Sequence, residues 1–309
     1  MTLEEYGIRQ GIGKGFKTYL WLMKVLVPIS LGVVLLQWTG LLSYAEFVLK
    51  PLMALLRLPP EAALPLIAGL VAAPGAALAT MVALPLTQAQ MTLMAIFVLI
   101  AHGFPHESVI QGRSGFPPLK ASLVRLAAAI LTVLAVAPFL DLNGVGGTAA
   151  QAVAQADPAL SAVLLNWLGE VGRLVLILFC IIMTIMILLE VIRAKGWIDP
   201  VVRVLSPLLR ALGLSPQAGV LWVTAAIFGL AFGAAVIVEE AESGRISQED
   251  LETLQLSIGI NHGLFDDPAL FLSLGLNPFW IYIPRLLTAV IAVRLLTLWR
   301  KLKRRRTPA

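Results

Sequence analysis

The chain has 309 residues, of which 59% are hydrophobic and only 13% are charged, whereas soluble domains carry about 25% charged residues. This composition excludes a soluble globular domain. The formal net charge of +5 includes the basic stretch WRKLKRRR at 299–306, which directly follows an apolar run. That placement is typical of a cytoplasmic anchor against anionic lipid and excludes a nucleic-acid-binding domain.

Six apolar runs approach or exceed the about 20 residues that cross a bilayer. They lie at 18–40, 62–84, 118–140, 171–193, 217–238 and 278–299. Residues 1–17 are polar and lack the apolar segment of a signal peptide, so we interpret them as an amphipathic N-terminal helix. We therefore expect an all-α polytopic membrane protein.

Two parts of the sequence repeat. Residues 87–133 align without a gap with 247–293, at an offset of 160, and upstream the offset becomes 156. The alignment places His-Gly on His-Gly and Arg125 on Arg285. We expect two repeats, with the following boundaries: N-terminal helix 1–17, first repeat 18–140, small-residue linker 141–158, second repeat 159–299 and basic cytoplasmic tail 300–309.

Each repeat is predicted to contain three spans, a short interfacial helix and a pair of segments too short to cross singly. The interfacial helices are expected near 45–57 and 199–212. The short segments are expected at 88–101 with 106–114, and at 248–261 with 266–275. We interpret each pair as a re-entrant helical hairpin broken at His-Gly, because irregular backbone at membrane depth survives only where protein or a hydrated cavity surrounds it.

The distribution of basic residues predicts opposite insertion of the two repeats. With three spans per repeat and a cytoplasmic N-terminus, the cytoplasmic segments hold fifteen Lys and Arg residues and the outer segments hold four. This agrees with the positive-inside bias. An odd number of spans inverts the second repeat relative to the first, as in many secondary transporters whose sites form where the repeats meet.

All three histidines lie at the two hairpin breaks, and inversion would bring these breaks together near the midplane. Ionisable groups cost about 2.5–3.5 kcal/mol each there, so their clustering suggests a function. The residues expected to bind a substrate or ion are His102, Gly103, His106, Glu107, Asn261, His262, Gly263, Asp266 and Asp267. Arg125 and Arg285, each seven residues into a span, are the candidate counter-ions. The structural alternative is that these groups only satisfy one another.

Two kinds of site chemistry remain open. The residues His102, His106, Glu107, His262, Asp266 and Asp267 offer the ligands of a divalent metal such as Zn²⁺, Mn²⁺ or Fe²⁺, although their spacing matches no specific zinc signature. The same groups could bind a polar solute and exchange protons, since histidine titrates near physiological pH. No resident cofactor is specified beyond a divalent metal or a coupling proton or ion.

The small-residue segment GLVAAPGAALATMVAL, the polar hairpin NHGLFDDPALFLSLGLNPFW and the following PRLLTAVIAVRLL carry a family resemblance. They resemble the Gate, or nucleoside recognition, domain of spore maturation proteins A and B, of the membrane part of ferrous-iron transport protein B and of concentrative nucleoside transporters. The chain looks like both spore maturation units fused. It departs from the iron transporter in having no preceding GTPase domain, and from the nucleoside transporters in showing no oligomerisation scaffold.

The resemblance implies a transport-type role without naming a substrate. We expect a membrane transporter of a small polar solute, nucleoside-like or anionic, coupled to protons or ions. The alternatives are a divalent-metal transporter and a spore-maturation-like assembly protein without transport. The hairpins offer no convincing nucleophile, so we do not expect an enzyme. The expected location is the inner (plasma) membrane with both termini cytoplasmic, and the expected partners are lipid and the solute or ion, with a homodimer also allowed.

Overall fold

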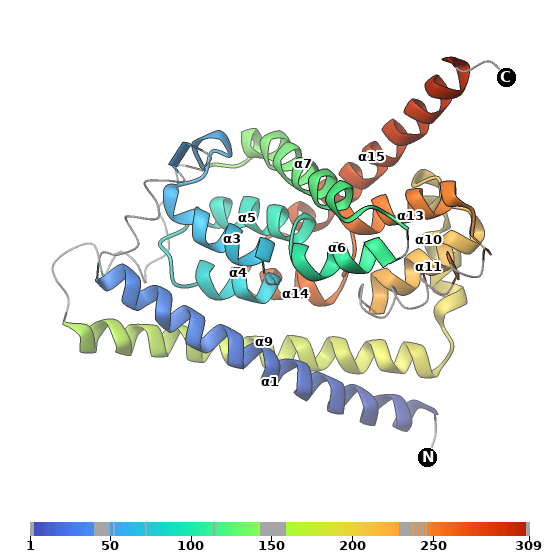
Figure 1. The fold of residues 1–309 in the computed structure, drawn as a ribbon. Coiled ribbons are helices and arrows are strands. Elements are labelled where there is room, and N and C mark those ends of the chain that lie inside the picture. Colours follow the sequence, from blue (N-terminus) through green and yellow to red (C-terminus); the bar gives the residue numbers. More distant parts are fainter. Residues whose placement is uncertain are drawn as a thin grey trace.

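A computed structural model shows an all-helical chain (Figure 1). The structure describes residues 3–39, 50–51, 53–71, 73–113, 115–142, 159–228, 237, 240–241, 244 and 246–306. Over these residues there is no β-strand, as the composition predicts. Three of the described helical segments are long and apolar enough to cross a membrane: Pro118–Phe139, Leu160–Leu188 and Pro278–Lys303.

Two long helices lie side by side along one edge of the molecule, α1 (Leu3–Trp38) and α9 (Leu160–Ala194). They run antiparallel, and Lys14 Nζ reaches Glu190 Oε1 at 2.8 Å. Gly11 faces α9 so closely that a Cβ there would lie 2.5 Å from the Ile187 Cα. Small residues at four-residue spacing allow such close packing between membrane helices. The expected boundary at residue 17 falls inside α1, which continues without a break.

The predicted span at 62–84 is wrong. The chain there forms a 3₁₀ turn η1 (Pro60–Ala62), then α3 (Ala63–Val71) and α4 (Pro74–Met81). Pro74 begins α4, and Ala73 before it is extended, with φ −165° and ψ 165°. Proline disfavours helical backbone in the residue that precedes it, so one helix cannot run through this point. The matching span at 217–238 begins as α11 (Pro216–Phe228), and most of its remainder lies outside the described residues.

The two predicted hairpins are present as pairs of short helices. The first is α5 (Gln88–Ile100) with α6 (Phe104–Arg113), and the second is α13 (Gln248–Ile260) with α14 (Asp266–Leu272). Each leading helix has 13 residues and is about 20 Å long, too short to cross a bilayer. Both leading helices begin at a hydroxyl cap, Thr87 or Ser247, whose side chain accepts a backbone N–H three residues later.

The closing helices of the two halves are α7 (Pro118–Val136), followed by the turn η2 (Ala137–Phe139), and α15 (Pro278–Arg306). The core places α5 against both α7 and α15, and α13 against both α15 and α7. The two hairpins are therefore interlocked at the centre of the molecule. The expected boundary between the second repeat and the basic tail lies inside α15.

The backbone repeats along with the sequence. Arg57 and Gly213, 156 positions apart, have φ of 56° and 65°, and each is followed by the same hydrogen-bonded helix end. The predicted interfacial helix of the second half is α10 (Ile198–Ala211), whereas residues 40–49 of its counterpart lie outside the described part of the chain. Equivalent positions of the two halves thus adopt the same local conformation.

Candidate functional site

The two His-Gly breaks are held open by neighbouring backbone. Gly103 and Gly263 have φ of 58° and 55°, the left-handed conformation that glycine adopts without steric cost. The Gly103 N–H donates to the Gly69 carbonyl at 3.0 Å, and the Leu264 N–H donates to the Ala226 carbonyl at 3.0 Å. Segments α3 and α11 therefore satisfy the backbone of the breaks, as the absence of water at membrane depth requires.

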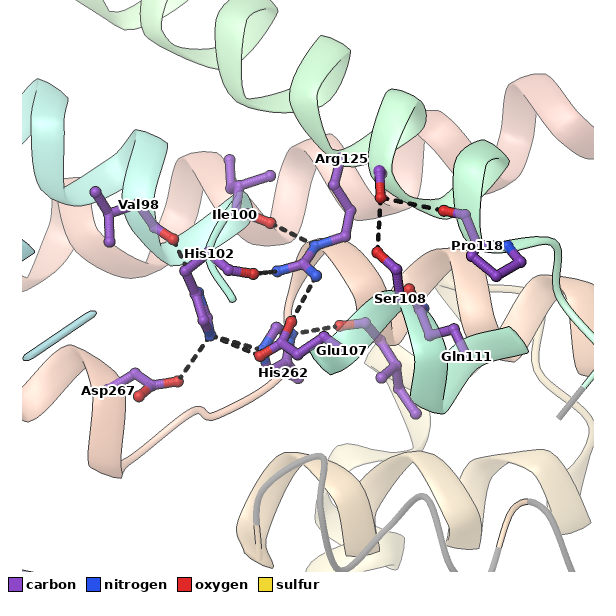
Figure 2. A network of polar contacts seen from close by, with 12 residues as sticks. Val98, Ile100, His102, Glu107, Ser108, Gln111, Pro118, Arg125, His262 and Asp267 are labelled. Carbon is purple, nitrogen blue, oxygen red and sulfur yellow. Dashed lines mark hydrogen bonds and ion pairs between the residues drawn. The ribbon is translucent and has the colours of Figure 1, made fainter. Parts of the chain in front are cut away.

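The two histidines that follow α5 and α13 point at each other (Figure 2). His102 Nδ1 lies 2.8 Å from the Val98 carbonyl, and His262 Nδ1 lies 2.9 Å from the Ile258 carbonyl. Because a carbonyl only accepts, each Nδ1 must carry the hydrogen. The two Nε2 atoms are 3.0 Å apart. In neutral imidazoles with this tautomer, both facing nitrogens are bare acceptors.

Glu107, from α6, joins the histidine pair to an arginine. Its Oε1 lies 3.0 Å from His102 Nε2 and 3.2 Å from His262 Nε2. Its Oε2 forms an ion pair of 2.5 Å with Arg125 Nη1, and neither atom makes a hydrogen bond to a described residue. All four side chains are almost fully buried. The predicted counter-ion role of Arg125 is thus matched by a direct contact.

Arg125 also ties the first break to α7. Its Nε donates to the Ile100 carbonyl and its Nη2 donates to the His102 carbonyl, both at 2.9 Å. These carbonyls belong to the end of α5 and would otherwise be unsatisfied. Arg285 repeats one of these bonds, from Nη2 to the His262 carbonyl at 2.8 Å. The arginines therefore anchor the backbone of both breaks as well as carrying charge.

The second half contributes buried polar groups, several of which have no hydrogen-bond partner among the described residues. Asp267 Oδ2 lies 3.7 Å from His102 Nε2, and its side chain is 20% exposed. Arg285 and Asn261 are both fully buried. Arg285 Nε and Nη1, both Asn261 side-chain atoms and Asp266 Oδ1 have no hydrogen-bond partner among the described residues. Here the structure leaves Arg285 without the ion pair that its counterpart makes.

Most of the predicted residues come together, as expected from a meeting of the two breaks. His102, Glu107, His262 and Asp267 converge, Gly103 and Gly263 form the turns, and Asn261 and Asp266 lie in the second break. The His106 side chain lies outside the described part of the structure. Sequence reasoning missed the buried pair Gln111 and Gln255, whose side chains hydrogen-bond across the halves at 3.2 Å. No local sequence signal singled out these two glutamines, since both lie in helices with several other polar residues.

Three acceptor atoms meet at one point of the site without a donor of their own. These are the two histidine Nε2 atoms and Glu107 Oε1, which all lie within 4.8 Å of one another. Bare lone pairs at this separation repel, so this geometry favours a proton or a metal ion among them. The Nδ1–carbonyl bonds are the outer contacts that orient metal-ligating histidines, so this set fits a divalent ion.

Two cavities bordered by described residues lie away from this cluster. One of about 420 Å³ is lined by α1, α9 and the segments that follow α4 and α14, including Trp38, Trp167 and Glu170. The other, of about 400 Å³, is almost wholly apolar and borders Leu264 and Phe265, just before the second hairpin helix. The polar cluster is therefore a compact centre with an apolar cavity beside one of its breaks.

Comparison with known proteins gives two matches. The family profile described as Nucleoside recognition (Gate) matches residues 19–112. The membrane protein YvoD of Bacillus subtilis (strain 168) is 30% identical over 305 residues, which cover 95% of each chain. No solved structure matches the chain significantly. This chain belongs to the same family of Gate-domain membrane proteins as YvoD.

Proposed function

We propose that this Gate-family membrane protein is a transporter of a small polar solute, with a coupling cation bound where its two hairpin breaks meet. The observation that carries the proposal is the convergence of His102 Nε2, His262 Nε2 and Glu107 Oε1. A purely structural network would place donors against acceptors. This one directs three acceptors at one point, which suits a cation that enters and leaves.

Formal charge supports a cation at this centre. Arg125 and Arg285 contribute two positive charges. Glu107, Asp266 and Asp267 contribute three negative charges, so with neutral histidines the cluster holds one net negative charge. Burying an uncompensated charge costs several kcal/mol. One bound proton or metal ion removes the imbalance, and its release restores it.

A divalent transition metal as the transported species is the second candidate. Two imidazole nitrogens and a carboxylate suit borderline metals such as Zn²⁺, Mn²⁺ or Fe²⁺. Asp267 Oδ2, 3.7 Å from His102 Nε2, lies near enough to become a fourth ligand after a small movement. The same geometry therefore serves either a coupling proton or a metal cargo.

Titration of the detergent-purified protein separates the two cations. A metal cargo predicts stoichiometric binding of Zn²⁺ or Mn²⁺ near neutral pH, with proton release and loss of binding in His102→Ala and His262→Ala. A coupling proton predicts no metal retention, but a proton uptake on acidification that both variants reduce. If the variants alter neither metal nor proton binding, the polar centre is structural, and the assembly-protein alternative is favoured over a transporter.

We propose further that the two halves insert with opposite orientation in the inner membrane, with both termini cytoplasmic. Antiparallel α1 and α9 and the fifteen-to-four distribution of basic residues support this arrangement. Cys180 is the single cysteine. Its replacement by alanine allows single cysteines to be placed near residues 5 and 305 and labelled in intact cells. Labelling of the two ends from opposite sides of the membrane would overturn the topology.

A further inference from the structure

The second half of the site repeats the histidine contact and one arginine contact of the first half. His262 and Arg285 Nη2 make the same backbone contacts as His102 and Arg125 Nη2, whereas the Nε bond of Arg125 to the Ile100 carbonyl has no described equivalent on Arg285. At the position of Glu107, however, the second half has Asp267, which is one methylene shorter. Glu107 reaches both histidines and its arginine. Asp267 forms an ion-pair contact with His102, and no described carboxylate lies within ion-pair distance of Arg285.

Arg285 is consequently a buried guanidinium with spare donors. It is fully buried, and its Nε and Nη1 have no partner among the described residues. In the first half, the equivalent Nη1 contacts a carboxylate oxygen of Glu107. Buried charged donors are normally paired, and those left unpaired cost more than an ordinary lost hydrogen bond. An acceptor from outside the described chain is therefore expected on Arg285 Nη1.

Asn261 supplies a second buried group of the same kind. It lies directly before His262, whose carbonyl Arg285 holds, and it is fully buried. Neither its side-chain oxygen nor its nitrogen has a partner among the residues described. The equivalent residue in the first half is Ala101, so the amide is an addition of the second half alone. An apolar residue would fill this position without any desolvation cost.

We propose that Arg285 and Asn261 bind the carboxylate group of a small solute. This inference rests on the proposed transport function and specifies the chemical class of its solute. The first half contains the same kind of contact, because a Glu107 carboxylate oxygen lies against the equivalent nitrogen of Arg125. The Asn261 amide nitrogen is the donor for the second oxygen. A doubly charged phosphate suits the site less well, because Asp266 and Asp267 lie in the same break.

The carboxylate site and the cation site must act together. A bound carboxylate adds a negative charge to a cluster that already holds one, so it binds well only when a cation occupies the centre formed by His102, Glu107 and His262. Coupling of this kind is reciprocal: the solute increases cation affinity by the factor by which the cation increases solute affinity. Cation-dependent solute binding is what coupled transport requires.

Asp267→Glu is the sharpest test, because it completes in the second half the ion pair present in the first. The probes are acetate, lactate and pyruvate, with glycerol and chloride as controls, measured by thermal shift and calorimetry on the full-length protein in detergent. In the wild type, the carboxylates are expected to raise the melting temperature and the controls are not. Asp267→Glu is expected to melt higher without ligand and to bind carboxylates about tenfold more weakly. Asp250→Glu adds the same methylene outside the site and should behave as the wild type.

Asn261→Ala keeps the test meaningful if Asp267→Glu folds poorly. Alanine is the residue at the equivalent position of the first half, Ala101. The variant should weaken carboxylate binding while leaving the ligand-free melting temperature unchanged or higher. Wild-type protein that binds protons or metal at the histidines but no carboxylate would overturn this inference and leave the proposed function standing. Protein that binds neither would overturn both. Equal carboxylate binding by the wild type and Asp267→Glu would also overturn the inference.

Discussion

In both hairpins a histidine and an arginine bind the backbone of the break, but only the first arginine forms an ion pair with a described carboxylate. In the first, the arginine of α7 holds two carbonyls and forms an ion pair with Glu107. In the second, the arginine of α15 holds one carbonyl and keeps two nitrogens without a described partner. The carboxylates at the equivalent position, Glu107 and Asp267, differ by one methylene. We expect the first half to be the more stable of the two and the second half to be suited to a ligand.

Replacing each arginine should give the largest difference in stability between the two hairpins. Arg125→Met leaves Glu107 buried without its counter-ion, and we expect it to lower the free energy of unfolding by about 3–5 kcal/mol. Arg285→Met loses one backbone hydrogen bond but removes an unpaired guanidinium, so the expected loss is smaller. Thermal melts of ligand-free protein in detergent measure both. Equal losses would mean that the two ion-pair states do not differ.

The histidines test whether both halves contribute to the cation site. His102→Ala and His262→Ala should each reduce cation affinity by more than the about 10–100-fold loss seen when only an outer partner of a metal ligand is changed. Their effects should be similar, because each Nε2 contacts the other and Glu107 Oε1. Calorimetry with Zn²⁺ or Mn²⁺ provides the measurement.

The outer helices provide a test of how the halves are held together. Gly11→Ala places a methyl group against the Ile187 backbone and should lower the free energy of unfolding by about 1–3 kcal/mol. Gly13→Ala is the matched control, since no atom lies within 4 Å of its added Cβ. It should be neutral, or stabilising by up to about 1 kcal/mol through helix propensity. Similar melting temperatures for the two variants would argue against close packing of α1 on α9.

The helix caps give the smallest expected difference between the hairpins. Thr87 is buried and forms a reciprocal capping box with Gln90, whereas Ser247 is exposed and makes a single cap bond. Thr87→Ala should cost about 1–2 kcal/mol and Ser247→Ala about 0.5–1 kcal/mol. Denaturation of both variants under one condition measures the difference. A larger loss of stability for Ser247→Ala than for Thr87→Ala would contradict the expected order of the two caps.

Several features could be predicted because their signals are local. The His-Gly breaks, the hydroxyl caps and the short helices on either side follow from glycine, threonine and serine at defined positions. The ungapped repeat also placed Arg125 and Arg285 at equivalent points. The break at Pro74 had an equally local signal, but the hydropathy of 62–84 outweighed it in our prediction. Hydropathy counts apolar residues and is insensitive to a missing backbone donor.

By itself, the sequence determined an all-helical membrane protein with two related halves and polar residues at two breaks, because composition, periodicity and glycine placement act within a few residues. Only the tertiary structure decided that the two Nε2 atoms face each other and that Glu107 pairs with Arg125 while Asp267 leaves Arg285 unpaired. These outcomes depend on reach across helices from distant parts of the chain. Periodicity along the chain does not encode those distances.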